Sequence, residues 1–401
     1  MSKLEELIQK YCPDGVEYKL FAEVFETITD YTAAGSFKNI ADNVKYLKVP
    51  DYAMLIRTTD LKSKFSKGDF IYVSHSAFDY LWRVNMDKEC IVMPNVGNCG
   101  EIYYLQPQDL PYEHCALAPN AILVRSNTHN NRYLSYCLQV EHFQKQLAKI
   151  TSPVGQSKFN KTELKKLEIP IPPLPVQNEI VRILDTFTEL QTELQTELQK
   201  RLQQYNYYRD NLLSFEGRDD VEWKKLGDIC TVYTGGEVPE CSIKGDTPQG
   251  DMIYPIWGNG KEIYGYASTY QIEQDAVCIS SIGANTGAVF FHKAFFTPII
   301  RLKVLIPKDK GLLARYLYHS LSVIGFEVKK SSVPNMNSNE VKQKTIPVPS
   351  LAEQQKIVDV LDRFDALTTD LSQGLPAEIE KRRQQYEYYR DKLLTFKRKE
   401  A

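Results

Sequence analysis

Two segments of the chain carry the spacing of apolar residues that is typical of long amphipathic helices. In the first, apolar side chains recur every three or four residues from Ile180 to Leu212, with polar and charged residues between them. This periodicity predicts one helix over residues 176–213, about 57 Å long at 1.5 Å per residue.

The second segment begins the same pattern at Ile357, but a Gly-Leu-Pro triplet at 374–376 interrupts it. We expect a kink or turn there, because glycine and proline break helices. Each apolar stripe is narrow, so one partner helix is enough to cover it. We predict that the two segments pair within the chain as an antiparallel coiled coil; the alternative is that each pairs with a second copy of the chain.

The remaining segments have the pattern of mixed α/β domains. Short β-type runs separated by glycine turns occur twice, at 93–98 with 101–104 and at 276–281 with 288–291. Residues 131–148 and 311–325 have helical spacing, and we expect each to close one globular domain.

Comparison of the chain with itself reveals three blocks that occur twice in the same order. They are Val-Glu-[Tyr/Trp]-Lys at 16–19 and 221–224, Ile-Pro-[Ile/Val]-Pro at 169–172 and 346–349, and Gln-Gln-Tyr-x-Tyr-Tyr-Arg-Asp at 203–210 and 384–391. The inserts between the first and second blocks differ in length and sequence. The framing blocks are alike whereas the inserts differ, which indicates that two domains of different specificity are mounted in the same way.

The repeat defines the predicted architecture, which is α+β with a pseudo-twofold internal repeat. Two α/β domains alternate with the two long helical segments. The predicted ranges are 1–168 for the first domain, 169–217 for the first helical spacer, 218–345 for the second domain and 346–401 for the second spacer.

Composition narrows the class of protein. Apolar residues make up 43% and charged residues 25% of the chain, and no apolar run is long enough for a membrane helix. The start lacks the layout of a secretory signal, so we expect a cytoplasmic protein without a membrane partner. None of the eight cysteines forms a Cys-x-x-Cys pair, so free thiols are expected rather than a metal site.

The net charge of −2 gives no whole-molecule argument for a polyanionic partner. A field that attracts nucleic acid must then come from the placement of the charges or from a partner subunit.

The repeated blocks resemble those of the specificity subunits of type I restriction-modification enzymes, and the resemblance covers nearly the whole chain. Its most specific marks are Ile-Pro-x-Pro-x-Leu-x-x-Gln-x-x-Ile-Val-x-x-Leu-Asp at 169–185 and 346–362, and Gln-Gln-Tyr-x-Tyr-Tyr-Arg-Asp-x-Leu-Leu at 203–213 and 384–394. The two inserts resemble different types of target-recognition domain. The first spacer departs from the second because it lacks the Gly-Leu-Pro triplet.

The resemblance implies that each domain reads one half of a split double-stranded DNA target and that the helices set the gap. It also implies two methyltransferase subunits that bring S-adenosylmethionine, and restriction subunits that bring ATP and magnesium chemistry. The chain itself is then expected to hold no cofactor.

The sequence lacks motifs for ATP binding and for methyl transfer, and its one nuclease-like string, Pro50-Asp51 with Asp60-Leu61-Lys62, is short and degenerate. It contains neither a Gly-x4-Gly-Lys-[Ser/Thr] phosphate loop nor the [Asp/Asn]-Pro-Pro-[Tyr/Phe] motif of amino-methyltransferases. We therefore expect a non-catalytic subunit. The alternatives are a coiled-coil scaffold without DNA binding and a type II-like fused restriction-modification protein.

Candidate DNA contacts are polar residues at glycine-punctuated loops and at the end of an apolar run, where side chains can reach phosphates or base edges. In the first domain they are Arg57, Thr58, Thr59, His75 and Asn98. In the second domain they are Asn259, Lys261, Tyr264, Ser281, Asn285 and Thr286. For each group the alternative is a structural role in turns or in the core.

The Tyr-x-Tyr-Tyr-Arg clusters carry more aromatic surface than one helical stripe buries. Part of each cluster is predicted to dock another subunit, and packing within the chain is the alternative. The predicted docking residues are Tyr205, Tyr208, Arg209, Tyr386, Tyr389 and Arg390.

Overall fold

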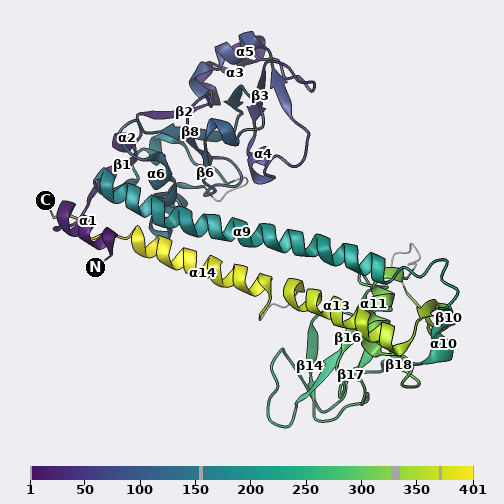
Figure 1. The fold of residues 1–401 in the computed structure, drawn as a ribbon. Coiled ribbons are helices and arrows are strands. Elements are labelled where there is room, and N and C mark those ends of the chain that lie inside the picture. Colours follow the sequence, from purple (N-terminus) through teal and green to yellow (C-terminus); the bar gives the residue numbers. More distant parts are fainter. Residues whose placement is uncertain (1, 153–156, 327–334, 370–372, 401) are drawn as a thin grey trace. The chain divides into compact units, whose positions relative to one another are not determined.

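One long helix and two successive shorter helices form the helical part of the chain (Figure 1). The computed structural model describes residues 2–152, 157–326, 335–369 and 373–400. Helix α9 (Leu174–Leu212) has 39 residues and lies within two residues of the predicted bounds. Helix α13 (Leu351–Thr369) ends before the Gly-Leu-Pro triplet and α14 (Leu375–Leu393) begins inside it, which confirms the predicted interruption.

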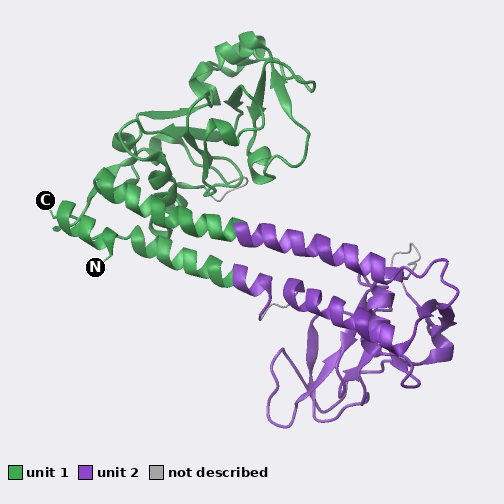
Figure 2. Ribbon diagram, in the orientation of Figure 1, with its two compact units in different colours: residues 1–192, 380–401 green, residues 193–379 purple. Residues whose placement is uncertain are grey.

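The chain divides into two compact units, and both the long helix and α14 are shared between them (Figure 2). Unit 1 comprises Met1–Thr192 with Glu380–Ala401, and unit 2 comprises Glu193–Ile379. The units are defined by contacts, whereas the predicted ranges follow the sequence repeat, and those ranges stay a prediction.

Unit 1 holds two sheets of more than two strands. The four-stranded antiparallel sheet has the order β2-β8-β5-β6, with β2 (Thr27–Asp30), β8 (Ala121–Arg125), β5 (Cys90–Pro94) and β6 (Tyr103–Leu105). The three-stranded sheet has the order β4-β3-β7, with β4 (Ile71–Val73), β3 (Ala53–Ile56) and β7 (Cys115–Leu117), and its strands β3 and β7 are parallel. Its helices are α1 (Lys3–Tyr11), α2 (Phe21–Val24), α3 (Phe37–Asn43), α4 (Thr58–Lys62), α5 (His75–Tyr80), α6 (Asn131–Cys137), α7 (Glu141–Ile150) and α8 (Lys161–Leu164).

Unit 2 repeats this plan with different lengths. Its antiparallel sheet has the order β11-β18-β15-β16, with β11 (Cys230–Thr234), β18 (Lys303–Pro307), β15 (Ala276–Ile279) and β16 (Val289–His292). Its second sheet has the order β12-β14-β13-β17, with β12 (Ser242–Lys244), β14 (Ile263–Ala267), β13 (Tyr254–Trp257) and β17 (Thr297–Pro298), and β13 and β17 are parallel. Its helices are α10 (Leu226–Ile229), α11 (Ala314–Ile324) and α12 (Ser338–Gln343).

The repeated Val-Glu-[Tyr/Trp]-Lys and Ile-Pro-[Ile/Val]-Pro blocks pair with each other in both units. Strand β1 (Glu17–Leu20) is antiparallel to β9 (Glu168–Ile171), and β10 (Glu222–Lys225) is antiparallel to β19 (Thr345–Val348). The registers are equivalent, since Glu17 faces Ile171 and Glu222 faces Val348. Each ladder directly precedes a helix of the scaffold, since β9 is followed by α9 and β19 is followed by α13.

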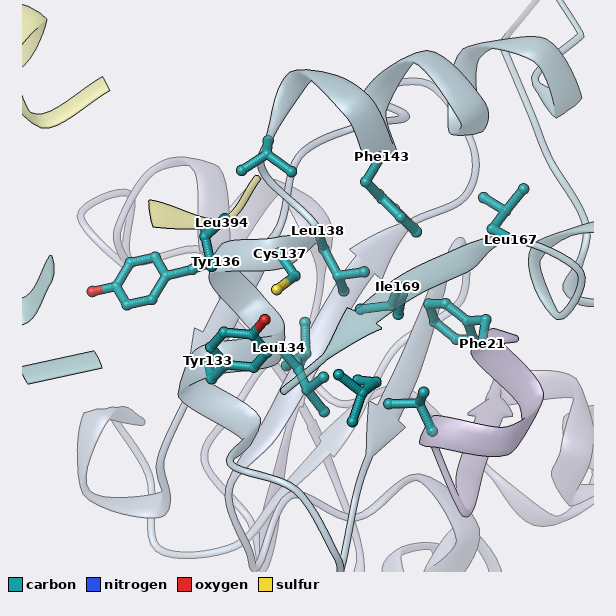
Figure 3. Packing of buried hydrophobic residues seen from close by; sticks show 14 of the residues in the cluster. Phe21, Tyr133, Leu134, Tyr136, Cys137, Leu138, Phe143, Leu167, Ile169 and Leu394 are labelled. Atoms are coloured by element: carbon teal, nitrogen blue, oxygen red, sulfur yellow. The ribbon is translucent and has the colours of Figure 1, made fainter. Parts of the chain in front are cut away.

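The core of unit 1 joins the first turns of α9 to the globular part. Val176, Ile180 and Leu184 from the predicted apolar stripe are buried in it. Figure 3 shows the side chains of Cys137, Leu138, Ile169 and others of this cluster converging. The equivalent stripe residues Ile357, Val358 and Leu361 belong to the core of unit 2.

The predicted helix over 131–148 consists of two helices, because α6 ends at Cys137 and α7 starts at Glu141. The side chain of Gln144 donates to the carbonyls of Leu138 and Gly100, which satisfies backbone groups at the break. The helix predicted over 311–325 is α11.

Candidate nucleic-acid interface

An arginine-aspartate contact fixes each globular domain to its long helix. Arg132 of α6 donates from Nε to Asp185 of α9 at 2.8 Å, and the hydroxyl of Tyr136 donates to the same carboxylate at 2.5 Å. In unit 2, Nη2 of Arg315 donates to Asp362 at 2.6 Å. The repeated Leu-Asp motif supplies both aspartates, so each domain contacts its helix through the same position of the repeat.

The second of these contacts has a histidine in place of the tyrosine. Nε2 of His319 lies 2.7 Å from Asp362, and burial lowers the pKa of this histidine. His319, Asp362 and Asp365 are close enough together to hold a metal ion. However, Arg315 also donates to Asp365 at 3.1 Å, so one guanidinium already compensates both carboxylates.

Arg57 of the first domain is engaged in an internal ion pair. Its Nε and Nη2 donate to the two carboxylate oxygens of Asp60 at 2.9 and 2.7 Å, and its backbone N–H donates to Asp60 as well. Asp60 is only 2% exposed. Arg57 therefore has a structural role in the turn between β3 and α4, where Thr58 is half-buried and Thr59 is exposed.

His75 is exposed at the first turn of α5 and belongs to a stack of three rings. Its ring centroid lies 4.0 Å from that of Tyr52, whose other neighbour is His114 at 4.4 Å. The ring of His75 is inclined by 34° to that of Tyr52, and its exposed side chain lies 3.7 Å from the carboxylate of Asp79.

The loop that carries Asn98 is held by the backbone of residues 157–159. Gly97 donates to the carbonyl of Ser157 at 2.7 Å, and Gly97 and Gly100 have φ of 84° and 104°, a region that favours glycine. Asn98 itself is exposed. This loop thus combines a fixed backbone with an accessible amide side chain.

Asn259 and Ser281 of the second domain support the structure of the loops and do not extend from them. Oδ1 of Asn259 accepts from the backbone N–H of Ser281 at 2.7 Å, and its Nδ2 donates to the carbonyl of Ile300 at 2.5 Å. Ser281 is fully buried, and its hydroxyl donates to the carbonyl of Arg301 at 2.6 Å. In this structure the Ser281 side chain cannot reach a base edge.

The neighbouring candidates are accessible. Asn285 is exposed, Thr286 is half-buried with its hydroxyl on the carbonyl of Gly283, and Lys261 is exposed. Lys261 also borders a cavity of about 720 Å³ that Trp257 and Arg315 help to line. Tyr264 packs beside the small core of Ile256, Ala267 and Ile299, so its role is at least partly structural.

The predicted docking residues divide into packed and exposed members. Tyr386 packs against the core of unit 1, and the guanidinium of Arg390 lies 5.8 Å from its ring; Arg209 lies 5.7 Å from the ring of Tyr205. Tyr208 and Tyr389 are partly exposed. The most exposed rings of the two clusters are two residues that the prediction omitted, Tyr207 at 66% and Tyr388 at 61%.

A family model that matches both copies of the tandem repeat identifies the family of the chain. The sequence model of the family described as "Type I restriction modification DNA specificity domain" matches residues 13–204 and again residues 218–381. The chain belongs to this family. The first match includes the β1-β9 ladder and the second includes the β10-β19 ladder.

Individual relatives agree with membership of the type I specificity family. The chain is 37% identical over 275 residues to the specificity subunit of the Escherichia coli type I restriction enzyme EcoR124I/EcoR124II. The aligned region covers 59% of this chain and 65% of that protein. The chain is 34% identical over 316 residues to a putative type I specificity subunit of Mycoplasma pneumoniae, with 74% of this chain and 90% of that protein covered.

The fold also has a counterpart among solved structures. The type I restriction-modification S subunit of M. genitalium aligns with a TM-score of 0.59 over 95% of this chain and 96% of that chain, at 14% sequence identity. The likeness shows that the two-domain fold with long helices is common to both proteins. Among the described residues, no helix is long and apolar enough to cross a membrane.

Proposed function

We propose that this chain is the DNA-recognition subunit of a type I restriction-modification complex and that it binds a bipartite double-stranded target. The observation that carries the proposal is the tandem repeat, in which two domains share their sheet order and their attachment to a helix but differ in their loops. In this proposal residues 1–168 and 218–345 each read one half-site, and residues 169–217 and 346–401 set the distance between them.

Catalysis belongs to other chains in this proposal. Two methyltransferase subunits bring S-adenosylmethionine, restriction subunits bring ATP and magnesium, and the complex acts in the cytoplasm. The exposed tyrosines Tyr207 and Tyr388 are the proposed docking points, with the predicted residues around them as support. In the recognition domains, the proposed DNA contacts are the accessible side chains Thr59, His75, Asn98, Lys261 and Asn285.

A domain exchange tests the proposal. Residues 226–340 are replaced by the matching segment of a related subunit, and methylated adenines are mapped in a strain that also expresses the methyltransferase subunit. One half of the methylated motif should change while the other half stays the same. A change in both halves would contradict the modular reading.

A gel-shift experiment separates this function from that of a coiled-coil scaffold. The chain together with its methyltransferase subunit should bind a duplex that contains the mapped motif more tightly than a random duplex. Equal binding to both duplexes would favour the scaffold. Asn285→Ala should weaken binding to the motif by about 1–3 kcal/mol if this residue makes a base contact.

A further inference from the structure

A strained turn precedes the strand β18 in the second domain. Ile300 and Arg301 are consecutive non-glycine residues with φ of 52° and 60°. This left-handed region is unfavourable for side chains with a Cβ atom, and most of all for a β-branched residue such as isoleucine. Such strain persists only where the surrounding structure over-determines the backbone, and it concentrates at functional sites.

Four hydrogen bonds hold this turn. The N–H groups of Ile300 and Arg301 donate to the carbonyls of Gly236 and Gly235 at 2.8 and 3.1 Å. The carbonyls of Ile300 and Arg301 accept from the side chains of Asn259 and Ser281. Gly235 approaches so closely that an added Cβ would lie 2.8 Å from the backbone of Pro298. Every backbone polar group of the two residues is therefore satisfied within the protein.

The side chains of the turn, in contrast, face solvent. Ile300 is 49% exposed, and Arg301 is exposed. Residues 218–326 contain two other arginines, Arg218 and Arg315, and both bind carboxylates. Among the described residues Arg301 has no carboxylate partner.

A second basic residue, Lys303, lies beside the turn. Lys303 is only 6% exposed, and its ammonium donates to the hydroxyl of Thr234 at 3.1 Å. Burial and the nearby Arg301 lower the pKa of this lysine. The turn has a fixed backbone and presents the guanidinium of Arg301 and the apolar side chain of Ile300, with Lys303 behind them. These groups suit a DNA groove, which combines anionic phosphates with base edges that accept hydrogen bonds.

The first domain has a turn at the equivalent place. It precedes β8, the strand that corresponds to β18, and it ends on Asn120 with φ of 73°. The N–H of Ala118 donates to Ile56 at 2.9 Å, as the N–H of Ile299 donates to Trp257 at 2.8 Å. The carbonyl of Asn120 accepts from the N–H of Asn95, and the side chain of Asn120 is exposed. The two domains thus present different polar side chains from corresponding turns.

We propose that these turns are the base-reading elements of the two domains, with Arg301 reading a guanine in one half-site and Asn120 an adenine in the other. The inference rests on the proposed function and adds the residues that determine specificity. Arginine makes bidentate hydrogen bonds to guanine and asparagine makes them to adenine. Asn259 and Ser281 are positioning residues for Arg301.

The test uses the full chain with its methyltransferase subunit. Methylome sequencing of the unaltered complex defines the motif, and a duplex with this motif is compared with a random duplex. Arg301→Ala should relax one position in the second half-site only, and should weaken binding to the motif by about tenfold to a hundredfold. Binding to the random duplex should change by less than about threefold. Asn120→Ala should act in the same way on the first half-site.

Two further variants distinguish base reading from its alternatives. Arg301→Lys should restore the lost position only in part, because lysine also donates to guanine but lacks the forked donor geometry of arginine. An equal loss of affinity for the motif and for the random duplex in Arg301→Ala would indicate a phosphate contact and overturn the inference. Asn259→Ala should relax the same position as Arg301→Ala, and the double variant should be no worse. A lowered melting temperature with an unchanged motif would reduce Asn259 to a purely structural role and overturn its assignment.

The control is Arg363→Ala, which removes an exposed arginine of α13. This variant should leave the motif unchanged. An unchanged motif and affinity in Arg301→Ala would overturn the inference while leaving the proposed function intact. Failure of the unaltered complex to prefer any sequence would instead overturn the proposed function, and that result needs no variant.

Discussion

The ring of Phe187 stacks on the ring of Tyr389, with centroids 5.5 Å apart and planes inclined by 23°. At the equivalent positions of the other repeat, Phe364 stacks on Tyr208, also at 5.5 Å and with an inclination of 28°. The first half of α9 thus contacts the end of α14, and its second half contacts α13. Within each unit the helices pair in the antiparallel order that the sequence predicts.

Truncation of a stacked tyrosine should destabilise the protein. Tyr389→Ala should lower the free energy of unfolding by about 1–2 kcal/mol, because it removes both the ring contact and buried apolar area. Tyr388→Ala should change stability by less than about 0.5 kcal/mol, because its ring is mostly exposed. Thermal unfolding measures both variants. If Tyr388 docks a methyltransferase subunit, only its variant combines normal stability with weakened subunit binding.

Loss of the Arg57 side chain should lower the free energy of unfolding. Arg57→Ala leaves the buried carboxylate of Asp60 without its bidentate partner, at a cost of about 2–4 kcal/mol. Asp69→Ala is the matched control, because this mostly exposed carboxylate lies 4.0 Å from Arg57 and contributes little. Denaturant unfolding compares the two. Equal stabilities would show that the Arg57-Asp60 pair does not hold the turn.

Stability should fall in mild acid because of His292. Burial lowers the pKa of His292 to about 4, and its ring stacks on Trp257 at 4.1 Å. The unfolded chain therefore binds the proton more readily between pH 6.5 and pH 4, so stability is complete above pH 6.5 and declines as the pH falls through this window. The loss between pH 7.5 and pH 5 should be about 2 kcal/mol.

The variant His292→Phe checks this assignment. Phenylalanine retains an aromatic ring beside Trp257 but cannot take up a proton. Unfolding at the two pH values should show a smaller acid loss in the variant than in the unaltered protein. An acid loss of the same size in both would assign it to other groups.

A longer spacer should widen the gap in the DNA target. Four residues inserted between Glu193 and Gln199 add about 6 Å along α9, and DNA rises about 3.4 Å per base pair. The gap between the half-sites should grow by about two base pairs, while the half-sites stay the same. Insertions of three or five residues should be tolerated less well, because they rotate the apolar stripe away from its partner. Methylome sequencing reads the outcome, and an active variant with an unchanged gap would contradict the spacer role.

The sequence alone predicted the helices, their interruption and the repeated architecture. These features depend on periodicity and on residues that break helices, which act over a few positions along the chain. The repeat also indicated where the strands β1 and β9 would frame a domain, because the same blocks recur around dissimilar inserts. The split of the helix predicted over 131–148 was missed, since its apolar spacing continues through the break at Leu138.

The roles of individual loop residues were decided by the tertiary structure. Asn259 and Ser281 have the chemistry of DNA contacts, but their side chains bind backbone carbonyls of Ile300 and Arg301, which lie far along the chain. The left-handed conformation of Ile300 contradicts its local preference, and hydrogen bonds from distant residues such as Gly236 impose it. Local pattern predicts which segments form helices and strands, whereas burial and strain depend on contacts between segments that only the folded chain brings together.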